Sequence, residues 1–203
     1  MRKSTLFLLA ILAFVIWHQK GGNISVPGIG GAPPSGMAAP DQPVQSKPMN
    51  NSVINLKGYL ITPLYDYSVT ALVLGKKGYG DRSSDLSPYD LALGWGPLSS
   101  KYTLDHMDIK QYGRWYHYRY DAEFPMSPRK IIHNSANTHI IPADKSVLKI
   151  LKDVKKYDTV TMHGHLVSVR KPDNSFTWKS STSRKDSGDG SCEVFYVTSL
   201  TIH

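Results

Sequence analysis

The chain has 203 residues, a formal net charge of +8 at pH 7 and a single cysteine, Cys192. One thiol excludes an internal disulfide and a zinc site built from several cysteines, so the fold must be held by packing. Arg2, Lys3 and Lys20 carry three of the charges, which leaves about +5 for the remainder. This excess is compatible with a solvated basic face or with anionic partners such as phospholipid headgroups, cell-envelope polymers or nucleic acid.

Residues 1–19 combine a basic start with an apolar segment, and no charge occurs from Ser4 to Gln19. At about 1.5 Å per residue, this stretch spans about 24 Å as a helix, somewhat less than the ~30 Å core of a bilayer. No A-x-A-like cleavage site follows it directly. We therefore expect an uncleaved signal anchor that contacts the membrane through residues 4–19, with a cleaved signal peptide as the alternative. Either one places the C-terminal part outside the cytoplasm.

Residues 20–52 are predicted to form a flexible linker. Six glycines and six prolines fall between Gly21 and Pro48. Such a segment buries too little apolar surface to offset its ordering entropy. Residues 53–203 are then long enough for a single globular domain with its own core.

The domain is predicted to be mainly β with a few short helices, an α+β fold. Alternating or β-branched apolar residues predict five strands, at residues 53–62, 67–74, 114–120, 159–170 and 193–202. Gly164 lies in the middle of the fourth of these strands and would permit a sharp bend. This pattern favours a small curled sheet or an OB-like barrel behind the N-terminal membrane segment.

Three helices are predicted from their start signals. Ser87-Pro88 and Ser127-Pro128 each pair a capping residue with proline at the first helical position, and Gly94 is expected to end the first helix. Asp144 is expected to cap a third helix that runs to about Lys156. Its polar face carries five lysines, which are either solvated or a contact for an anionic surface. They are Lys145, Lys149, Lys152, Lys155 and Lys156.

Cys192 lies in a glycine-rich turn before the last predicted strand. A thiol there would be a nucleophile if a histidine lowers its pKa, and His133 and His139 are the candidate bases for such a catalytic pair. The alternatives are a small buried residue at the start of a strand, or a thiol that pairs with a second chain.

His163 and His165 are two residues apart on a predicted strand, so both should point to one face. Such a pair binds a metal when a third ligand arrives from elsewhere, for which His133 and His139 are candidates. The alternative is a pair of polar residues on a solvent-facing strand. No cofactor-binding motif is recognised, and no cofactor is expected.

Trp95 stands between two glycines, and Trp115 lies between Arg114 and other aromatic residues. Together with Arg119, these residues are candidates for a binding groove, because aromatic rings beside arginines stack on sugars or bases. Aromatic residues of a protein core are the alternative interpretation.

Four segments, DLALGWGPLS, RWYHYRY, HNSANTHIIPA and GDGSCE, together resemble a family of uncharacterised bacterial proteins that are membrane-anchored or exported. The resemblance extends over most of the domain. It implies a single β-rich domain of the bacterial envelope, and it brings no established activity, cofactor or partner.

The leading hypothesis is a binding or assembly module of unknown ligand, tethered to the bacterial inner membrane with its domain on the extracytoplasmic side. It follows from the anchor, the linker and the weakness of the catalytic signals. Its partner would be an anionic envelope component or a protein. A Cys/His hydrolase or transferase of the envelope and an OB-like nucleic-acid-binding protein are the alternatives, and a cleaved signal peptide would make the protein secreted.

Overall fold

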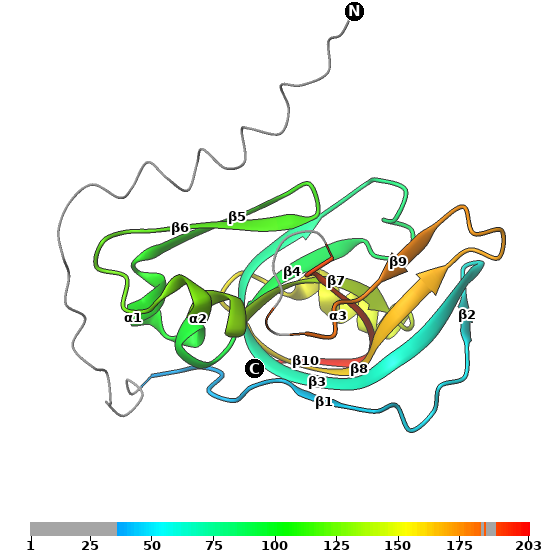
Figure 1. Cartoon of the computed structure of the whole chain (residues 1–203), viewed down its shortest axis with the longest axis horizontal. Helices are drawn as coiled ribbons and strands as arrows, with labels where there is room; N and C mark the ends of the chain where they lie inside the picture. The colour runs from blue at the N-terminus through cyan, green and yellow to red at the C-terminus, as the bar shows by residue number, and fades with distance from the viewer. Residues whose placement is uncertain (1–35, 184, 186–189) are drawn as a thin grey trace, which may run out of the picture. The chain divides into compact units, whose positions relative to one another are not determined.

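The computed structural model describes residues 36–183, 185 and 190–203 (Figure 1). The predicted membrane segment, residues 1–19, lies outside these residues, as does the first half of the predicted linker. In the part that is described, no helix is both long enough and apolar enough to cross a bilayer.

The described residues are mainly β, in agreement with the prediction. The strands are β1 (Val44–Ser46), β2 (Ile54–Leu56), β3 (Tyr59–Gly78), β4 (Tyr89–Gly94), β5 (Met107–Tyr112), β6 (Trp115–Tyr120), β7 (Ser135–Pro142), β8 (Thr159–Arg170), β9 (Thr177–Lys179) and β10 (Glu193–Ile202). The helices are η1 (Gly96–Ser99), α1 (Lys101–Leu104), α2 (Pro128–His133) and α3 (Lys145–Asp153).

Five strands pair in a ring, which makes the predicted curled sheet. β3 is long enough to pair with two strands: residues 60–72 pair with β8, and residues 72–78 pair with β4. The path continues from β4 to β7 and β10 and returns through β8 to β3, and the β7–β10 pair is the parallel one. Figure 1 shows β3, β8 and β10 side by side.

The interior of the ring is apolar because alternate residues of each strand point inward. Along β3 these are Tyr67, Val69, Ala71 and Val73, all buried in one cluster. Residues of the other ring strands complete this cluster, and α3 adds Val147, Leu151 and Val154. The helix therefore packs against the core of the ring.

Helix α3 begins as predicted. The Asp144 side chain accepts hydrogen bonds from the backbone N–H groups of Ser146 and Val147, which is the geometry of an N-cap. The helix ends at Asp153, three residues before the predicted end. The short helix α2 also begins where Ser127-Pro128 predicts it.

The prediction of a helix after Ser87-Pro88 is wrong. Tyr89–Gly94 is strand β4, and five of its six residues are buried between β3 and β7. A short apolar run does not reveal by its periodicity whether it is a buried helix or a strand buried on both faces. Here the segment forms a strand because it pairs with β3 on one side and with β7 on the other.

The first predicted strand, residues 53–62, is in fact a hairpin. Lys57 and Gly58 both have positive φ, at 52° and 79°, and they turn the chain between β2 and β3. Two consecutive residues with positive φ form the tight turn that matches the twist of paired strands. The alternation of apolar residues continues through this turn and hides it in the sequence.

Gly164 bends β8 as its position in the strand predicted. Its φ is +155°, and a Cβ there would lie 2.0 Å from the carbonyl oxygen of Tyr196 in β10. The register of β8 and β10 shifts between Val197 and Ser199, next to this contact. The ring thus requires glycine at this position.

The packed domain includes residues upstream of Val53. Val44–Ser46 pairs with β3, and Ala39 is buried. The backbone N–H of Ala39 donates to the Ser99 hydroxyl, at 3.0 Å. A segment with a linker-like composition is therefore ordered where it adds a strand to the edge of a sheet.

Candidate functional site

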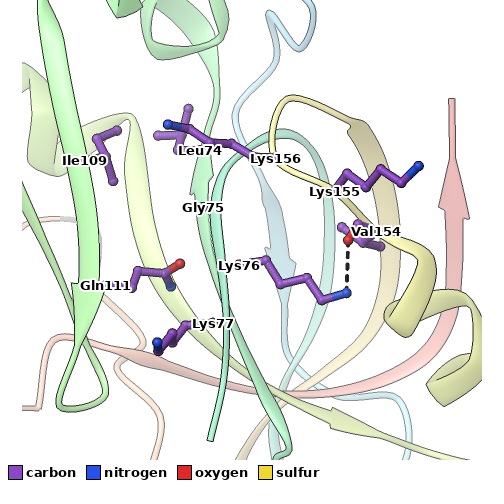
Figure 2. A pocket seen from close by; sticks show the side chains of 9 residues that line it. All are labelled: Leu74, Gly75, Lys76, Lys77, Ile109, Gln111, Val154, Lys155 and Lys156. Carbon is purple, nitrogen blue, oxygen red and sulfur yellow. Dashed lines mark hydrogen bonds between the residues drawn. The ribbon is translucent and has the colours of Figure 1, made fainter.

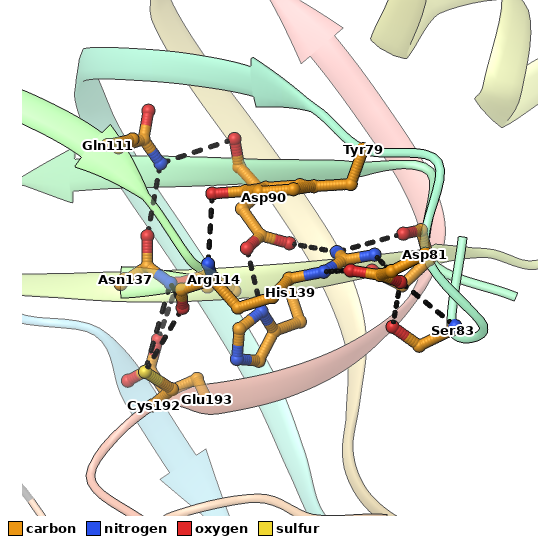
Figure 3. Close-up of polar contacts among 12 residues, drawn as sticks. Tyr79, Asp81, Ser83, Asp90, Gln111, Arg114, Asn137, His139, Cys192 and Glu193 are labelled. Atoms are coloured by element: carbon orange, nitrogen blue, oxygen red, sulfur yellow. Dashed lines mark hydrogen bonds and ion pairs between the residues drawn. The ribbon is translucent and has the colours of Figure 1, made fainter. Parts of the chain in front are cut away.

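Polar residues from five distant segments meet on the outer surface of the ring (Figure 3). Asp81 comes from the segment between β3 and β4, Asp90 from β4, Arg114 from the turn between β5 and β6, Asn137 and His139 from β7, and Cys192 from the position just before β10. The inward positions beside them, such as Leu91 and Ile140, belong to the core. We call Asp81, Asp90, Arg114, Asn137, His139 and Cys192 the polar cluster.

Asp90 is the centre of the cluster and is completely buried. One of its oxygens, Oδ1, accepts a hydrogen bond from Arg114 Nη1 at 2.7 Å. The other, Oδ2, lies 3.0 Å from His139 Nδ1, but the two atoms form no hydrogen bond. A carboxylate taken out of water is costly unless a counter-charge accompanies it. Arg114 supplies that counter-charge.

Arg114 also binds a second carboxylate. Its Nε and Nη2 donate to Asp81 Oδ2 and Oδ1, at 2.7 and 2.8 Å, which makes a bidentate pair. Hydrogen bonds from the Arg114 guanidinium hold the pKa of Asp81 well below its ordinary value. Burial lowers the pKa of Arg114, but the carboxylates of Asp81 and Asp90 raise it further, so the net change is upward.

The backbone of Arg114 is strained in a way that its side chain compensates. Gly113 and Arg114 have φ values of 61° and 68° and form the two-residue turn between β5 and β6. A non-glycine residue with positive φ persists where surrounding contacts over-determine it. The guanidinium lies 4.2 Å from the centroid of the Tyr79 ring and donates to the Ser87 carbonyl. These contacts fasten the hairpin turn to the segment between β3 and β4.

Amide side chains extend the cluster toward Cys192. Gln111 Nε2 donates to Asn137 Oδ1 at 3.0 Å, and Asn137 Nδ2 donates to the Arg114 carbonyl at 2.9 Å. The Cys192 sulfur lies 3.8 Å from Asn137 Nδ2 and 4.0 Å from the Arg114 carbonyl oxygen. Cys192 is half-buried, so its thiol borders a network of amides rather than open solvent.

The three predicted catalytic residues do not lie together in one place. His139 and Cys192 both belong to the polar cluster. His139 is buried, with the Trp178 ring 4.4 Å from its own. His133 ends α2, where its backbone carbonyl accepts a hydrogen bond from Trp95 Nε1 at 3.2 Å. His139 is therefore the base to consider for Cys192.

Sequence reasoning missed three acidic residues at or beside the cluster, Asp81, Asp90 and Glu193. Glu193 is buried next to Cys192, and its carboxylate accepts hydrogen bonds from the hydroxyls of Thr138 and Tyr67, at 2.9 and 3.3 Å. A usable signal was present, because Asp90 and Glu193 each stand directly before an apolar run, residues 91–93 and 194–197. Charged residues are almost never fully buried unless they are paired.

Trp95 does not line a groove, so its prediction as a surface contact is corrected. The side chain is fully buried in the core of the ring. Its indole N–H donates to Gln42 Oε1 at 2.9 Å, which satisfies the polar atom inside the protein. Trp95 therefore ties the segment before β1 to the core.

Trp115 and Arg119 lie on one face of the β5–β6 hairpin. The cross-strand partners Tyr112 and Trp115 share that face, as do Lys110 with His117 and Asp108 with Arg119. The Tyr112 and His117 rings stack at 3.7 Å, and Tyr112 is 59% exposed. We call this surface the outer hairpin face; its members are Asp108, Lys110, Tyr112, Trp115, His117 and Arg119.

The inner face of the hairpin packs on the ring. Ile109 and Tyr116 contact Leu72, Leu74 and Ala92, which point outward from β3 and β4. The Tyr116 hydroxyl forms a hydrogen bond with Ser135 Oγ at 2.6 Å, and burial raises its pKa. The hairpin thus covers part of the outer surface of the ring.

His163 and His165 gain no third metal ligand. His165 Nδ1 lies 2.8 Å from Asp66 Oδ1, and His163 is exposed. Among the residues that the structure describes, no group of three His, Cys, Asp or Glu side chains is arranged to hold a metal ion. The proposed contributor His139 is instead held against Asp90.

No protein-family model, curated protein or solved structure matches the chain. The resemblance to exported bacterial proteins stays a prediction. The function is therefore argued from the geometry of the cluster, the hairpin and the surfaces around them.

Proposed function

We propose that the protein is a binding module that recognises an anionic polymer of the bacterial envelope through its outer hairpin face. One observation carries the proposal: Arg114 of the polar cluster is paired with Asp81 and with the buried Asp90, whereas the cationic side chains of the outer hairpin face are exposed beside its aromatic rings, of which Trp115 is half-buried. Paired, buried charges hold a surface in place, and exposed ones remain available to a ligand.

The pairing of the strands supports an OB-like barrel as the scaffold. The ring runs β3–β4–β7–β10–β8, with β7 and β10 parallel and α3 between β7 and β8. Such barrels bind polymers over the outer face of their second and third strands. In this chain those strands are β4 and β7, and the hairpin inserted between them has its turn fastened over that face by Arg114.

The outer hairpin face would then bind the polymer in place of β4 and β7, which the hairpin covers. Trp115, Tyr112 and His117 offer rings for stacking, and Lys110 and Arg119 offer positive charge. Lys110 Nζ lies 3.5 Å from Asp108, and both side chains are largely exposed, so this pair is weak and is readily replaced by a ligand. An anionic glycan is the ligand that this surface and the expected location favour.

The test uses the full-length chain with dextran sulfate as the probe, titrated at several salt concentrations. We expect saturable binding that weakens as salt rises, because neutralised anionic groups release their counterions. Trp115→Ala and Arg119→Ala should each weaken binding. Arg129→Ala, which removes another exposed arginine from α2, is the matched control. No binding at low salt, or equal losses in the Arg119 and Arg129 variants, would contradict the proposal.

The same titration with a single-stranded DNA oligonucleotide tests the nucleic-acid alternative. Tighter binding to DNA than to dextran sulfate, lost in the Trp115 variant, would favour it. The proposed tether through residues 4–19 is tested separately by fractionating cells that express the full chain. Recovery of the protein in the soluble fraction would exclude the tethered form.

A Cys/His enzyme is the second candidate, supported by the Asp90–His139 contact. A carboxylate beside one ring nitrogen orients an imidazole for use as a base, and Cys192 lies in the same cluster. The rate of alkylation of Cys192 against pH decides. A fast reaction with a thiol pKa well below about 8.5, lost in His139→Gln, would favour the enzyme. A thiol that reacts only after unfolding would exclude it.

A further inference from the structure

A cleft lies between the inner face of the hairpin and the end of α3 (Figure 2). It is an open cleft with a volume of about 430 Å³, lined by β3, by β5 and by the segment that joins α3 to β8. Leu74, Ile109 and Val154 form its apolar walls. This volume is within the ~300–1,000 Å³ of small-molecule sites, which combine apolar walls with a few placed polar groups.

Four lysines line the cleft, and one of them has a structural role. Lys76 Nζ donates to the carbonyls of Leu151, Lys152 and Val154, at 2.7, 2.7 and 2.9 Å. These carbonyls end α3, where the helix dipole places partial negative charge. Lys76 therefore offsets a field that would otherwise repel an anion from the cleft.

The other three, Lys77, Lys155 and Lys156, come from two different elements and are exposed. In the described part of the chain none of them forms an ion pair with a carboxylate. Burial lowers the pKa of Lys76, and the carboxylates of Asp153 and Asp158 act on it in the opposite direction. Asp158 is engaged by the backbone N–H of Lys155, at 2.7 Å. Four lysines against two carboxylates leave the cleft with a net positive charge.

The cleft also holds an amide. Gln111 reaches it from β5, and its Nε2 is held by Asn137 Oδ1 in the polar cluster. Its Oε1 sits above Gly75, where a Cβ would lie only 2.7 Å away. Glycine at this position leaves the amide room beside β3, and the polar cluster fixes its orientation.

We propose that this cleft binds a phosphate group carried by a small molecule or a lipid headgroup. Lysine ammonium groups bind phosphate as point charges. Three lysines from two elements line the cleft and supply positive charge for a group with several anionic oxygens. The apolar walls fit the body of a phosphate ester. The inference goes beyond the proposed polymer contact, because the cleft lies on the opposite face of the hairpin.

The test is calorimetric titration of the full-length chain, in neutral detergent micelles, with inorganic pyrophosphate. One variant combines Lys77→Gln, Lys155→Gln and Lys156→Gln, and it keeps Lys76 so that α3 stays capped. The control combines Lys145→Gln, Lys149→Gln and Lys152→Gln, which removes the same charge from the exposed face of α3. We expect the first variant to weaken binding by about tenfold or more and the control by less than about twofold.

Two results would overturn the proposal. One is the absence of saturable pyrophosphate binding by the unmodified chain at near-physiological salt. The other is equal weakening in both triple variants, which would mean unspecific attraction to the net charge. Arg119→Ala should leave pyrophosphate binding unchanged, so failure of the polymer proposal and failure of this one are distinguishable.

Phosphatidylglycerol added to the micelles separates the two sources of phosphate. If the cleft holds a headgroup, the lipid competes and the apparent affinity for pyrophosphate falls in the unmodified chain. If the affinity stays the same, the ligand class is a soluble phosphate ester.

Discussion

Arg114 and Arg119 belong to one hairpin, yet the first is paired with carboxylates and the second is exposed. Arg114 is drawn into the polar cluster, where it pairs with Asp81 and with the buried Asp90. Arg119 lies on the outer hairpin face and is exposed. The difference shows that residue type does not decide between structural and functional roles. A charge that meets its partners away from water stabilises the fold, and one left in water remains available to a ligand.

The largest difference in unfolding free energy is expected between variants of the two arginines. Arg114→Met leaves Asp90 buried without its counter-charge, and we expect a loss of about 3–5 kcal/mol in the free energy of unfolding. Arg119→Met removes an exposed charge and should change it by less than about 0.5 kcal/mol. Urea unfolding at pH 7 measures both. A loss below about 1 kcal/mol for Arg114→Met would mean that the polar cluster does not hold the hairpin turn against the ring.

The histidines form the second matched pair. His139→Gln disturbs a buried contact with Asp90 and should cost about 1–3 kcal/mol of unfolding free energy. His117→Gln changes an exposed ring that stacks on Tyr112 and should cost less than about 0.5 kcal/mol. Thermal unfolding of the two variants side by side checks this, and similar melting temperatures would remove the distinction between the two surfaces.

Variants of Tyr116 and Tyr112 test the difference between the inner and the outer face of the hairpin. Tyr116→Phe removes the hydroxyl that bonds to Ser135, at a cost of about 1 kcal/mol. Tyr112→Phe removes an exposed hydroxyl and should be close to neutral. The raised pKa of Tyr116 gives a second measurement, because its hydroxyl should ionise at higher pH than that of an ordinary tyrosine. Ionisation of Tyr116 at the ordinary pH would show that the hairpin does not pack on the ring.

Asp81 and Asp108 give the smallest contrast, and it depends on pH. Arg114 holds the pKa of Asp81 below its ordinary value of 3.8, so the stability from this pair is complete above that value and is lost as pH falls through the lower, folded-state pKa. Because the side chain is 44% exposed, we expect only about 1 kcal/mol or less at pH 7.

Asp81→Asn should therefore be less stable than the unmodified chain at pH 7, and the gap should close as the pH falls well below 4. Asp108→Asn, in an exposed pair with Lys110, should show almost no gap at either pH. Acid unfolding curves of the three proteins provide the measurement. A gap for Asp81→Asn that stays constant down to pH 2 would contradict the ion-pair explanation.

Much of the β architecture was predictable from local patterns. The alternation at residues 159–170 and 193–202 yields β8 and β10, and Asp144 with its apolar stripe yields α3. These signals are local, because side-chain period and capping act within a few residues. Strand β4 was missed because its short apolar run fits either a helix or a strand.

The candidate site was predictable only in part. His139 and Cys192 were singled out by their chemistry and both lie in the polar cluster, whereas Arg114, predicted for a binding groove, is instead paired with Asp81 and Asp90. Asp81 and Asp90, which neutralise Arg114, were not singled out, because their importance comes from a contact across the fold. Trp95 was misjudged because a tryptophan between glycines reads the same whether its ring is buried or exposed.

The sequence by itself determined that this chain is β-rich, that its single thiol makes no internal disulfide, and that Gly164 sits where a strand must bend. Each of these depends on composition or on neighbours in the chain. Only the tertiary structure decided which charges are buried, that the hairpin covers β4 and β7, and that Lys76 caps α3 while Lys77 faces a cleft. Those outcomes depend on distances between segments far apart in the chain, and burial and pairing are set by those distances.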